Sequence, residues 1–215
     1  MALGTSLAVI MLNSISSARA HQRHGAIRWD VFKLLAPGVM AGALAGAWVA
    51  EQLSSLTLAV IFAVFLVLIG LQMLAAKQSK PQRSVPGTGG LLGAGGIIGC
   101  ISALVGIGGG SLTVPFLVWC NVPMAHAVAT SAAVGLPIAV AGAIGYVLTG
   151  WSNPLLPAWS LGYVYLPAFV GMAVAGSLCA PLGARIAHAL PAKRLKQIFG
   201  VFLLLIAARM LIRLL

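Results

Sequence analysis

The stretch GAWVAEQLSSLTLAVIFAVFLVLIGLQML at Gly46–Leu74 returns, with about half of its positions unchanged, as GARIAHALPAKRLKQIFGVFLLLIAARML at Gly183–Leu211. A second match lies upstream of each copy, where Gly4-Thr5-Ser6 corresponds to Ala129-Thr130-Ser131. A hydrophobic chain made of two related halves is the architecture of many secondary transporters, which bind substrate where the halves meet. The sequence therefore predicts two homologous repeats.

The predicted domain organisation follows from this repeat. The first repeat covers residues 1–76 and is incomplete at its N-terminal side, and the second covers residues 89–215 and contains a glycine-rich segment. Residues 77–88 form the longest polar stretch, which we interpret as a basic cytoplasmic linker.

The composition is that of a membrane protein. Hydrophobic residues make up 60% of the chain and charged residues only 7%, whereas about a quarter of the residues in a soluble domain are charged. The net charge of +11 is explained by cations in loops and at segment ends, so we expect no nucleic-acid partner. The fold class predicted is an all-α polytopic membrane protein.

The apolar runs predict about 7–8 membrane segments, because a helix needs about 20 apolar residues to span a bilayer. The fifth run is short, and it could be a half-helix or one arm of a re-entrant hairpin with the fourth. The expected segments lie at about 2–18, 34–52, 57–76, 89–107, 111–123, 125–149, 161–182 and 197–214.

The charges of the loops predict the orientation. Lys and Arg gather in Arg19–Lys33, Lys77–Arg83 and Arg185–Lys196, and basic loops face the cytoplasm. The loop Gly150–Trp159 and the turn Glu51–Ser54 contain no Lys or Arg and should face outward. The order of basic and uncharged loops is reversed between the halves, so we expect inverted repeats, which can open alternately to either side.

The most unusual motif is GIGGGSLTVP at Gly106–Pro115. Consecutive glycines within a membrane segment break a helix, and a break at membrane depth must be buried in protein or line a wet cavity. A half-helix that begins there would offer N–H groups and a positive dipole end to an anion. The alternative interpretation is a tight helix crossing in which only glycine fits.

Asp30 and Glu51 are the sole acidic residues of the sequence, and both lie at segment ends or in loops. Proton and cation carriers commonly place acidic groups inside their spans, so the pattern favours an anion held by N–H groups and hydroxyls. For any single hydroxyl, the alternative is a bond to the carbonyl four residues earlier in its own helix. The candidate substrate-binding residues are Gly108, Gly109, Gly110, Ser111, Thr113, Pro115, Thr130, Ser131, Thr5 and Ser6.

Other polar residues carry weaker indications. His126 could carry a proton, or it could be an interfacial side chain satisfied by water or backbone. Asn13 could face a cavity or bond to another helix. The cysteines match no metal-binding spacing, so we expect no metal and no other cofactor. We find no acid, base and nucleophile arrangement that would indicate an enzyme.

The segment GIGGGSLTVPFL at Gly106–Leu117, followed by AHAVATS at Ala125–Ser131, resembles the TauE/SafE family of sulfite and organosulfonate exporters. The first-half ALGTSL at Ala2–Leu7 and the two repeated helices also match. The resemblance implies a multi-pass permease of the bacterial inner membrane with two homologous halves. It also implies a cargo such as sulfite, sulfoacetate or a related organosulfonate, usually moved outward.

The chain departs from this family in its first repeat, which begins almost at Thr5-Ser6 and lacks a glycine-rich segment of its own. A late start codon, which we prefer, a fragment or a true loss would each explain the difference. The predicted function is a secondary transporter that exports a small anion by alternating access. The alternative is a non-transporting membrane scaffold or a truncated remnant. The expected partners are the anionic substrate and the lipid bilayer, and homo-oligomer formation stays open.

Overall fold

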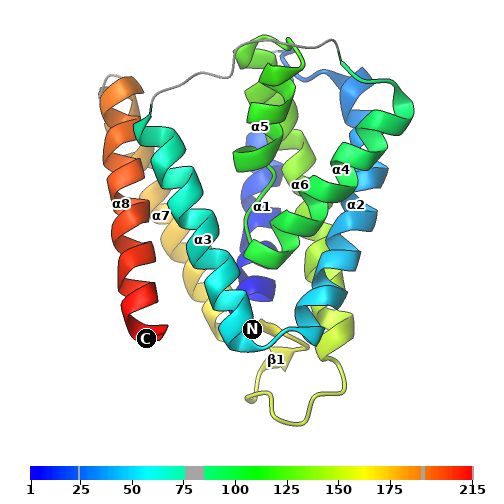
Figure 1. Ribbon diagram of the computed structural model, residues 1–215, viewed down its shortest axis with the longest axis vertical. Coiled ribbons are helices and arrows are strands. Elements are labelled where there is room, and N and C mark those ends of the chain that lie inside the picture. Colours follow the sequence, from blue (N-terminus) through cyan, green and yellow to red (C-terminus); the bar gives the residue numbers. More distant parts are fainter. Residues whose placement is uncertain (24, 76–84, 190–191, 215) are drawn as a thin grey trace. The chain divides into compact units, whose positions relative to one another are not determined.

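The computed structural model describes residues 1–23, 25–75, 85–189 and 192–214 (Figure 1). The eight helices in these residues follow the eight predicted segments in order, and the prediction of an all-α polytopic membrane protein is confirmed. The elements are α1 (Ala2–Arg23), α2 (Trp29–Gln52), α3 (Ser55–Leu74), α4 (Thr88–Val105), α5 (Gly110–Trp119), α6 (Met124–Gly150), β1 (Ser160–Leu161), β2 (Val164–Tyr165), α7 (Leu166–Ala189) and α8 (Ala192–Leu214).

Four of the described helices, α2, α3, α4 and α6, are long and apolar enough to cross a membrane. Shorter apolar stretches lie in α5, α7 and α8, at Gly110–Trp119, Leu166–Gly176 and Gln197–Ile212. The second half of α1 is more polar, because it contains Asn13, several serines and Arg19. Asn13, Ser14 and Ser17 of this half line a cavity.

The described chain forms two compact units. One comprises Met1–Gln52 and Ser79–Val170, and the other comprises Leu53–Gln78 and Gly171–Leu215. Each unit contains residues of both predicted repeats, so the compact units do not coincide with the sequence repeats. The boundaries of the repeats themselves stay a prediction.

In the first unit, α2 packs along α4 through glycines that bring the two backbones together. A Cβ atom added to Gly46 would lie 2.6 Å from the carbonyl oxygen of Cys100, and one added to Gly42 would overlap the carbonyl oxygen of Gly96. Small residues spaced four apart permit this close approach between membrane helices. The contact therefore depends on the absence of side chains at these positions.

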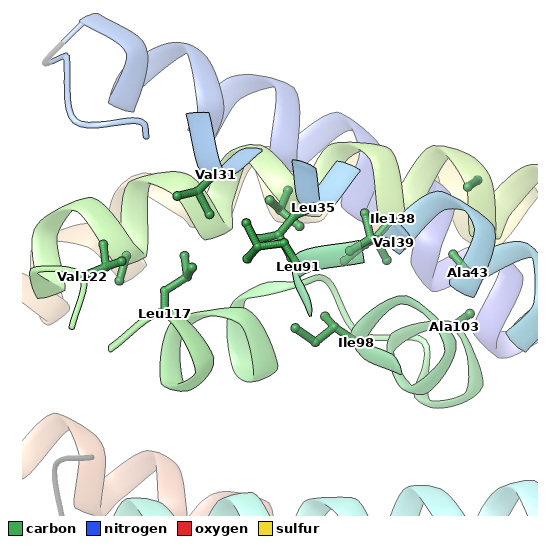
Figure 2. Close-up of a cluster of buried hydrophobic side chains, with 13 residues drawn as sticks. Val31, Leu35, Val39, Ala43, Leu91, Ile98, Ala103, Leu117, Val122 and Ile138 are labelled. Carbon is green, nitrogen blue, oxygen red and sulfur yellow. The ribbon is translucent and has the colours of Figure 1, made fainter. Parts of the chain in front are cut away.

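A cluster of buried apolar side chains lies between α2, α4, α5 and α6 (Figure 2). Leu35 of α2, Leu117 of α5 and Ile138 of α6 are each fully buried. Leu117 thus anchors the ten-residue helix α5 to the much longer helices around it. The same cluster fixes the position of the chain break that precedes α5.

One predicted boundary is wrong: the helix expected at 161–182 begins at Leu166, because β1 and β2 form a short antiparallel hairpin before it. Gly162 adopts a left-handed conformation with a φ of 54°, which glycine accommodates without a steric penalty. The N–H of Tyr165 donates to the Thr5 hydroxyl oxygen at 3.0 Å. This bond joins the hairpin to α1.

In the second unit, α3 and α8 pack against each other at small residues. A Cβ added to Gly70 would lie 3.1 Å from the carbonyl oxygen of Gly200, and one added to Gly200 would lie 3.0 Å from that of Gly70. Because Gly70 lies late in α3 and Gly200 early in α8, the two helices are antiparallel. Ala63 and Ala207, which are fully buried, correspond to Gly200 and Gly70 in the repeat alignment.

Candidate functional site

The centre of the candidate site is the break between α4 and α5, at residues 106–109. Gly106 ends α4 in a left-handed conformation with a φ of 69°. Its N–H donates to the Ala103 carbonyl at 3.3 Å, and the N–H of Ile107 donates to the Ser102 carbonyl at 3.0 Å. This pair of bonds is a Schellman motif, which glycine favours at a helix end.

The chain turns back after this break. In Figure 1, α4 descends into the first unit, and α5 runs in the opposite direction toward the end at which α4 begins. The ten residues of α5 are too few to span a bilayer, since a spanning helix needs about 20. The fifth predicted segment is therefore a half-helix, and it packs mainly against α6.

A cavity of about 220 Å³ lies where this break meets α1 and α6. Helix α1 contributes Asn13, Ser14 and Ser17 to its lining, and α6 contributes Ser131, Ala132 and Gly135. The break and the start of α5 contribute Gly108, Gly109, Gly110 and Ser111. None of these lining residues is ionisable, so their polar groups are hydroxyls, an amide and backbone.

The first turn of α5 supplies backbone donors to this cavity. The first bond of the helical ladder runs from the N–H of Thr113 to the carbonyl of Gly109, at 2.8 Å. The N–H groups of Gly110 and Ser111 precede this bond and have no partner within the helix. No side chain in the described part of the chain caps this helix start. The positive end of the α5 dipole therefore faces the cavity.

Ser131 is the most buried hydroxyl of the lining. It is only 1% exposed, and its oxygen has no hydrogen-bond partner among the described residues. A buried hydroxyl without a partner is unfavourable, because it has lost its bonds to water. Its place in the wall of the cavity means that a bound ligand could supply the missing bond.

The predicted site residues separate into two groups. The cavity brings together Gly108, Gly109, Gly110, Ser111 and Ser131. Thr113 is fully buried without a hydrogen-bond partner, but neither it nor Pro115 belongs to the lining.

Three other predicted hydroxyls serve structural contacts. The Thr5 hydroxyl donates to the carbonyl of Met1 at 2.9 Å, four residues earlier in its own helix. The Ser6 hydroxyl donates to the Gly106 carbonyl at 2.8 Å. The Thr130 hydroxyl accepts the N–H of Arg28 at 2.9 Å.

His126 lies outside the cavity lining. Its Nδ1 is 2.8 Å from the carbonyl oxygen of Ala26, so the ring contacts the loop between α1 and α2. In the same loop, the Arg28 guanidinium donates to Asp30 at 2.9 Å, and this hydrogen bond raises the pKa of Arg28 above its ordinary value. A role for His126 in proton coupling stays a prediction.

The structure adds Ser14, Ser17 and Gly135 to the residues that sequence reasoning proposed, and it places Asn13 at the cavity. A signal for the α1 residues is present in the sequence, because residues 13 and 17 are four apart and share one helix face. Gly135 likewise lies four residues after Ser131. A Cβ on Gly135 would lie 3.0 Å from the Ser14 hydroxyl oxygen, so this glycine lets α1 and α6 approach.

Known proteins resemble this chain along nearly its whole length. The model of the family described as sulfite exporter TauE/SafE matches residues 1–210. A "Probable membrane transporter protein" of Haemophilus influenzae is 34% identical over 99% of this chain and 81% of its own length. "Probable membrane transporter protein YunE" of Bacillus subtilis is 26% identical over 98% of this chain and 80% of its own length. No solved structure matches the chain significantly.

Proposed function

Because this chain belongs to the sulfite exporter TauE/SafE family, and is thus a multi-pass membrane transporter, we propose that it carries a small anion across the bacterial inner membrane. The single observation that supports an anion is the uncharged cavity at the break before α5, which the N-terminal end of that helix faces. A cation carrier would be expected to offer a carboxylate in such a place. The substrate class proposed is sulfite, sulfoacetate or a related organosulfonate, and the direction is export.

Alternating access is the mechanism that we propose for this export. The antiparallel pairing of α3 with α8 supports it, because the two helices are repeat mates and the counterparts of the contacting Gly70 and Gly200, which are Ala207 and Ala63, are small and buried as well. Such a contact is what a two-fold axis in the membrane plane would produce. Inverted repeats related by this axis can exchange their conformations and open the site to either side.

Transport measurements test the function directly. We expect proteoliposomes that contain the chain to release loaded sulfite or an organosulfonate faster than protein-free liposomes. Ser131→Ala should raise the substrate concentration for half-maximal transport roughly tenfold or more, because a hydrogen bond to a charged group contributes about 1.5–3 kcal/mol and each 1.4 kcal/mol is tenfold. Radiolabelled or spectroscopically detected efflux provides the measurement.

The matched control is Ser16→Ala, which removes an exposed hydroxyl of α1 outside the cavity lining. This variant should transport like the unmodified chain. The proposed function is contradicted if the folded, correctly inserted chain moves neither sulfite nor any organosulfonate tested.

The inverted orientation has its own test. Single cysteines can be introduced at Gln22, in the basic region, and at Leu155, in the uncharged loop, with the native cysteines replaced by alanine. Leu155 is 90% exposed, so a reagent can reach it. We expect a membrane-impermeant thiol reagent to label residue 155 from the periplasm and residue 22 only after the cell is opened. Labelling of both residues from one side would rule out the inverted arrangement.

A further inference from the structure

The two helix ends at the break differ in whether side chains bond to their backbone groups. This difference decides which sign of charge the break favours. Two side chains donate hydrogen bonds at the carbonyl end of α4: Tyr146 donates its hydroxyl to the Ala103 carbonyl at 3.0 Å, and Ser6 donates to the Gly106 carbonyl at 2.8 Å. The Schellman bonds described above satisfy the Ser102 carbonyl and bond the Ala103 carbonyl again. The carbonyls of Ser102, Ala103 and Gly106 thus each accept at least one hydrogen bond.

The N-terminal end of α5 has no comparable hydrogen bonds to side chains among the described residues. Its capping residue is Gly109, which has no side chain to accept a bond, and no other described side chain caps it. Exposed carbonyls and helix C-terminal ends coordinate cations in transporters, whereas helix N-termini bind anionic groups. With these three carbonyls bonded and no side-chain cap from the described residues at the start of α5, the break is arranged for a negative ligand.

The glycines of the cavity differ in what a side chain would meet. A Cβ on Gly108 would lie 3.0 Å from Ile10 Cγ2, and one on Gly109 would lie 2.9 Å from Ile138 Cδ1. At these two positions an added side chain would press against a neighbouring isoleucine side chain, which would have to shift. A Cβ on Gly110 would meet nothing closer than the Ser131 hydroxyl oxygen, at 3.9 Å. At Gly110 the missing side chain therefore leaves room in the cavity itself.

The space beside Gly110 lies next to two kinds of hydrogen-bond donor. One is the pair of N–H groups at the start of α5, on Gly110 and Ser111, and the other is the hydroxyl of Ser131. The Ser131 oxygen is buried and has no partner among the described residues, which is a second observation, independent of the helix end, that a ligand completes the site. All three residues are within the first unit.

We propose that the space beside Gly110 is an oxyanion subsite, in which backbone N–H groups of Gly110 and Ser111 and the hydroxyl of Ser131 donate to one negatively charged ligand group. This subsite deepens and rests on the function proposed above. The donors come from two helices and converge from different directions, so the matching ligand has several acceptor oxygens on one centre. Sulfite, sulfate and sulfonate groups have this chemistry, and a halide or a cation does not.

Binding to the purified full chain in detergent tests the subsite without a transport step. We expect sodium sulfite, sodium sulfate and sodium methanesulfonate to raise the thermal unfolding midpoint in a saturable manner, since a ligand that binds the native state stabilises it by mass action. Sodium chloride at equal ionic strength should produce no saturable shift. Isothermal titration calorimetry with the same salts gives the dissociation constants.

Gly110→Ala is the decisive variant, because its Cβ fills the proposed subsite while meeting no atom closely. It should unfold at the same midpoint as the unmodified chain without ligand, and it should bind each oxyanion at least about tenfold more weakly. Gly93→Ala is the matched control, since a Cβ there meets nothing within 4 Å and lies outside the cavity lining. It should bind like the unmodified chain.

If Gly110→Ala does not fold, Ser131→Ala takes its place, because it removes a donor and adds no volume; the same loss is expected. The subsite is overturned if the unmodified chain binds none of the three oxyanions, or if the folded variant binds them unchanged. Binding that follows these expectations without any transport would contradict the proposed function and leave the subsite standing. If the unmodified chain transports but the folded variant binds oxyanions unchanged, the subsite is contradicted and the proposed function still stands.

Discussion

Ser131→Asp is expected to abolish anion transport while the protein still folds. The new carboxylate would lie in the wall of the cavity, beside the start of α5. A carboxylate at a helix N-terminus is favourable, because it accepts hydrogen bonds from the free N–H groups and interacts with the positive end of the helix dipole. It would therefore occupy the donors that we propose for the substrate and repel any incoming anion.

The measurement is efflux from proteoliposomes, together with the thermal unfolding midpoint of the purified variant. Ser131→Asn is the matched control, because it has nearly the same shape as the aspartate without the charge. We expect it to keep a reduced but measurable rate. An aspartate variant that exports anions as fast as the asparagine variant would exclude Ser131 from the anion path.

Gly42→Leu is expected to have the largest effect on folding. A Cβ at this position would already overlap the carbonyl oxygen of Gly96, so a leucine forces α2 and α4 apart along their main contact. Overpacking typically costs about 1–3 kcal/mol and occasionally more, and here the obstacle is backbone, which cannot rotate away. We expect little or no monodisperse protein in size-exclusion chromatography after detergent extraction.

Ala45→Leu provides the comparison within the same helix. Ala45 is exposed on α2, so the added volume should be tolerated and the yield and unfolding midpoint should stay near those of the unmodified chain. Equal yields for the two leucine variants would show that α2 and α4 do not pack as described.

The order of the helices could be predicted from the sequence because each apolar run corresponds to one helix. The hairpin before α7 could not, since Leu161, Tyr163 and Val164 are as apolar as the helix that follows. Its conformation depends on tertiary contacts: Gly162 turns the chain, and Tyr163 donates its N–H to the Tyr146 carbonyl at 3.0 Å. These partners are distant in sequence or invisible in an apolar pattern.

The residues of the candidate site could likewise be predicted from the sequence only in part. The glycine motif identified the break, because consecutive glycines are unfavourable in the interior of a helix. The roles of Thr130 and Ser131 could not be separated, although they are adjacent. Successive helical residues point about 100° apart, so Thr130 reaches Arg28 whereas Ser131 reaches the cavity. Only the packing of α6 decides which hydroxyl faces the break.

The contact between α3 and α8 has a consequence for how such a chain could have arisen. Gly70 and Ala63 of one helix correspond to Ala207 and Gly200 of the other, so each of the two contacting glycines has a small, buried counterpart on the other helix. A self-complementary surface of this kind is what joins two identical subunits about a two-fold axis. If the halves are inverted repeats, as we propose, two separate copies of an ancestral half could pair through this contact before fusion made them one polypeptide.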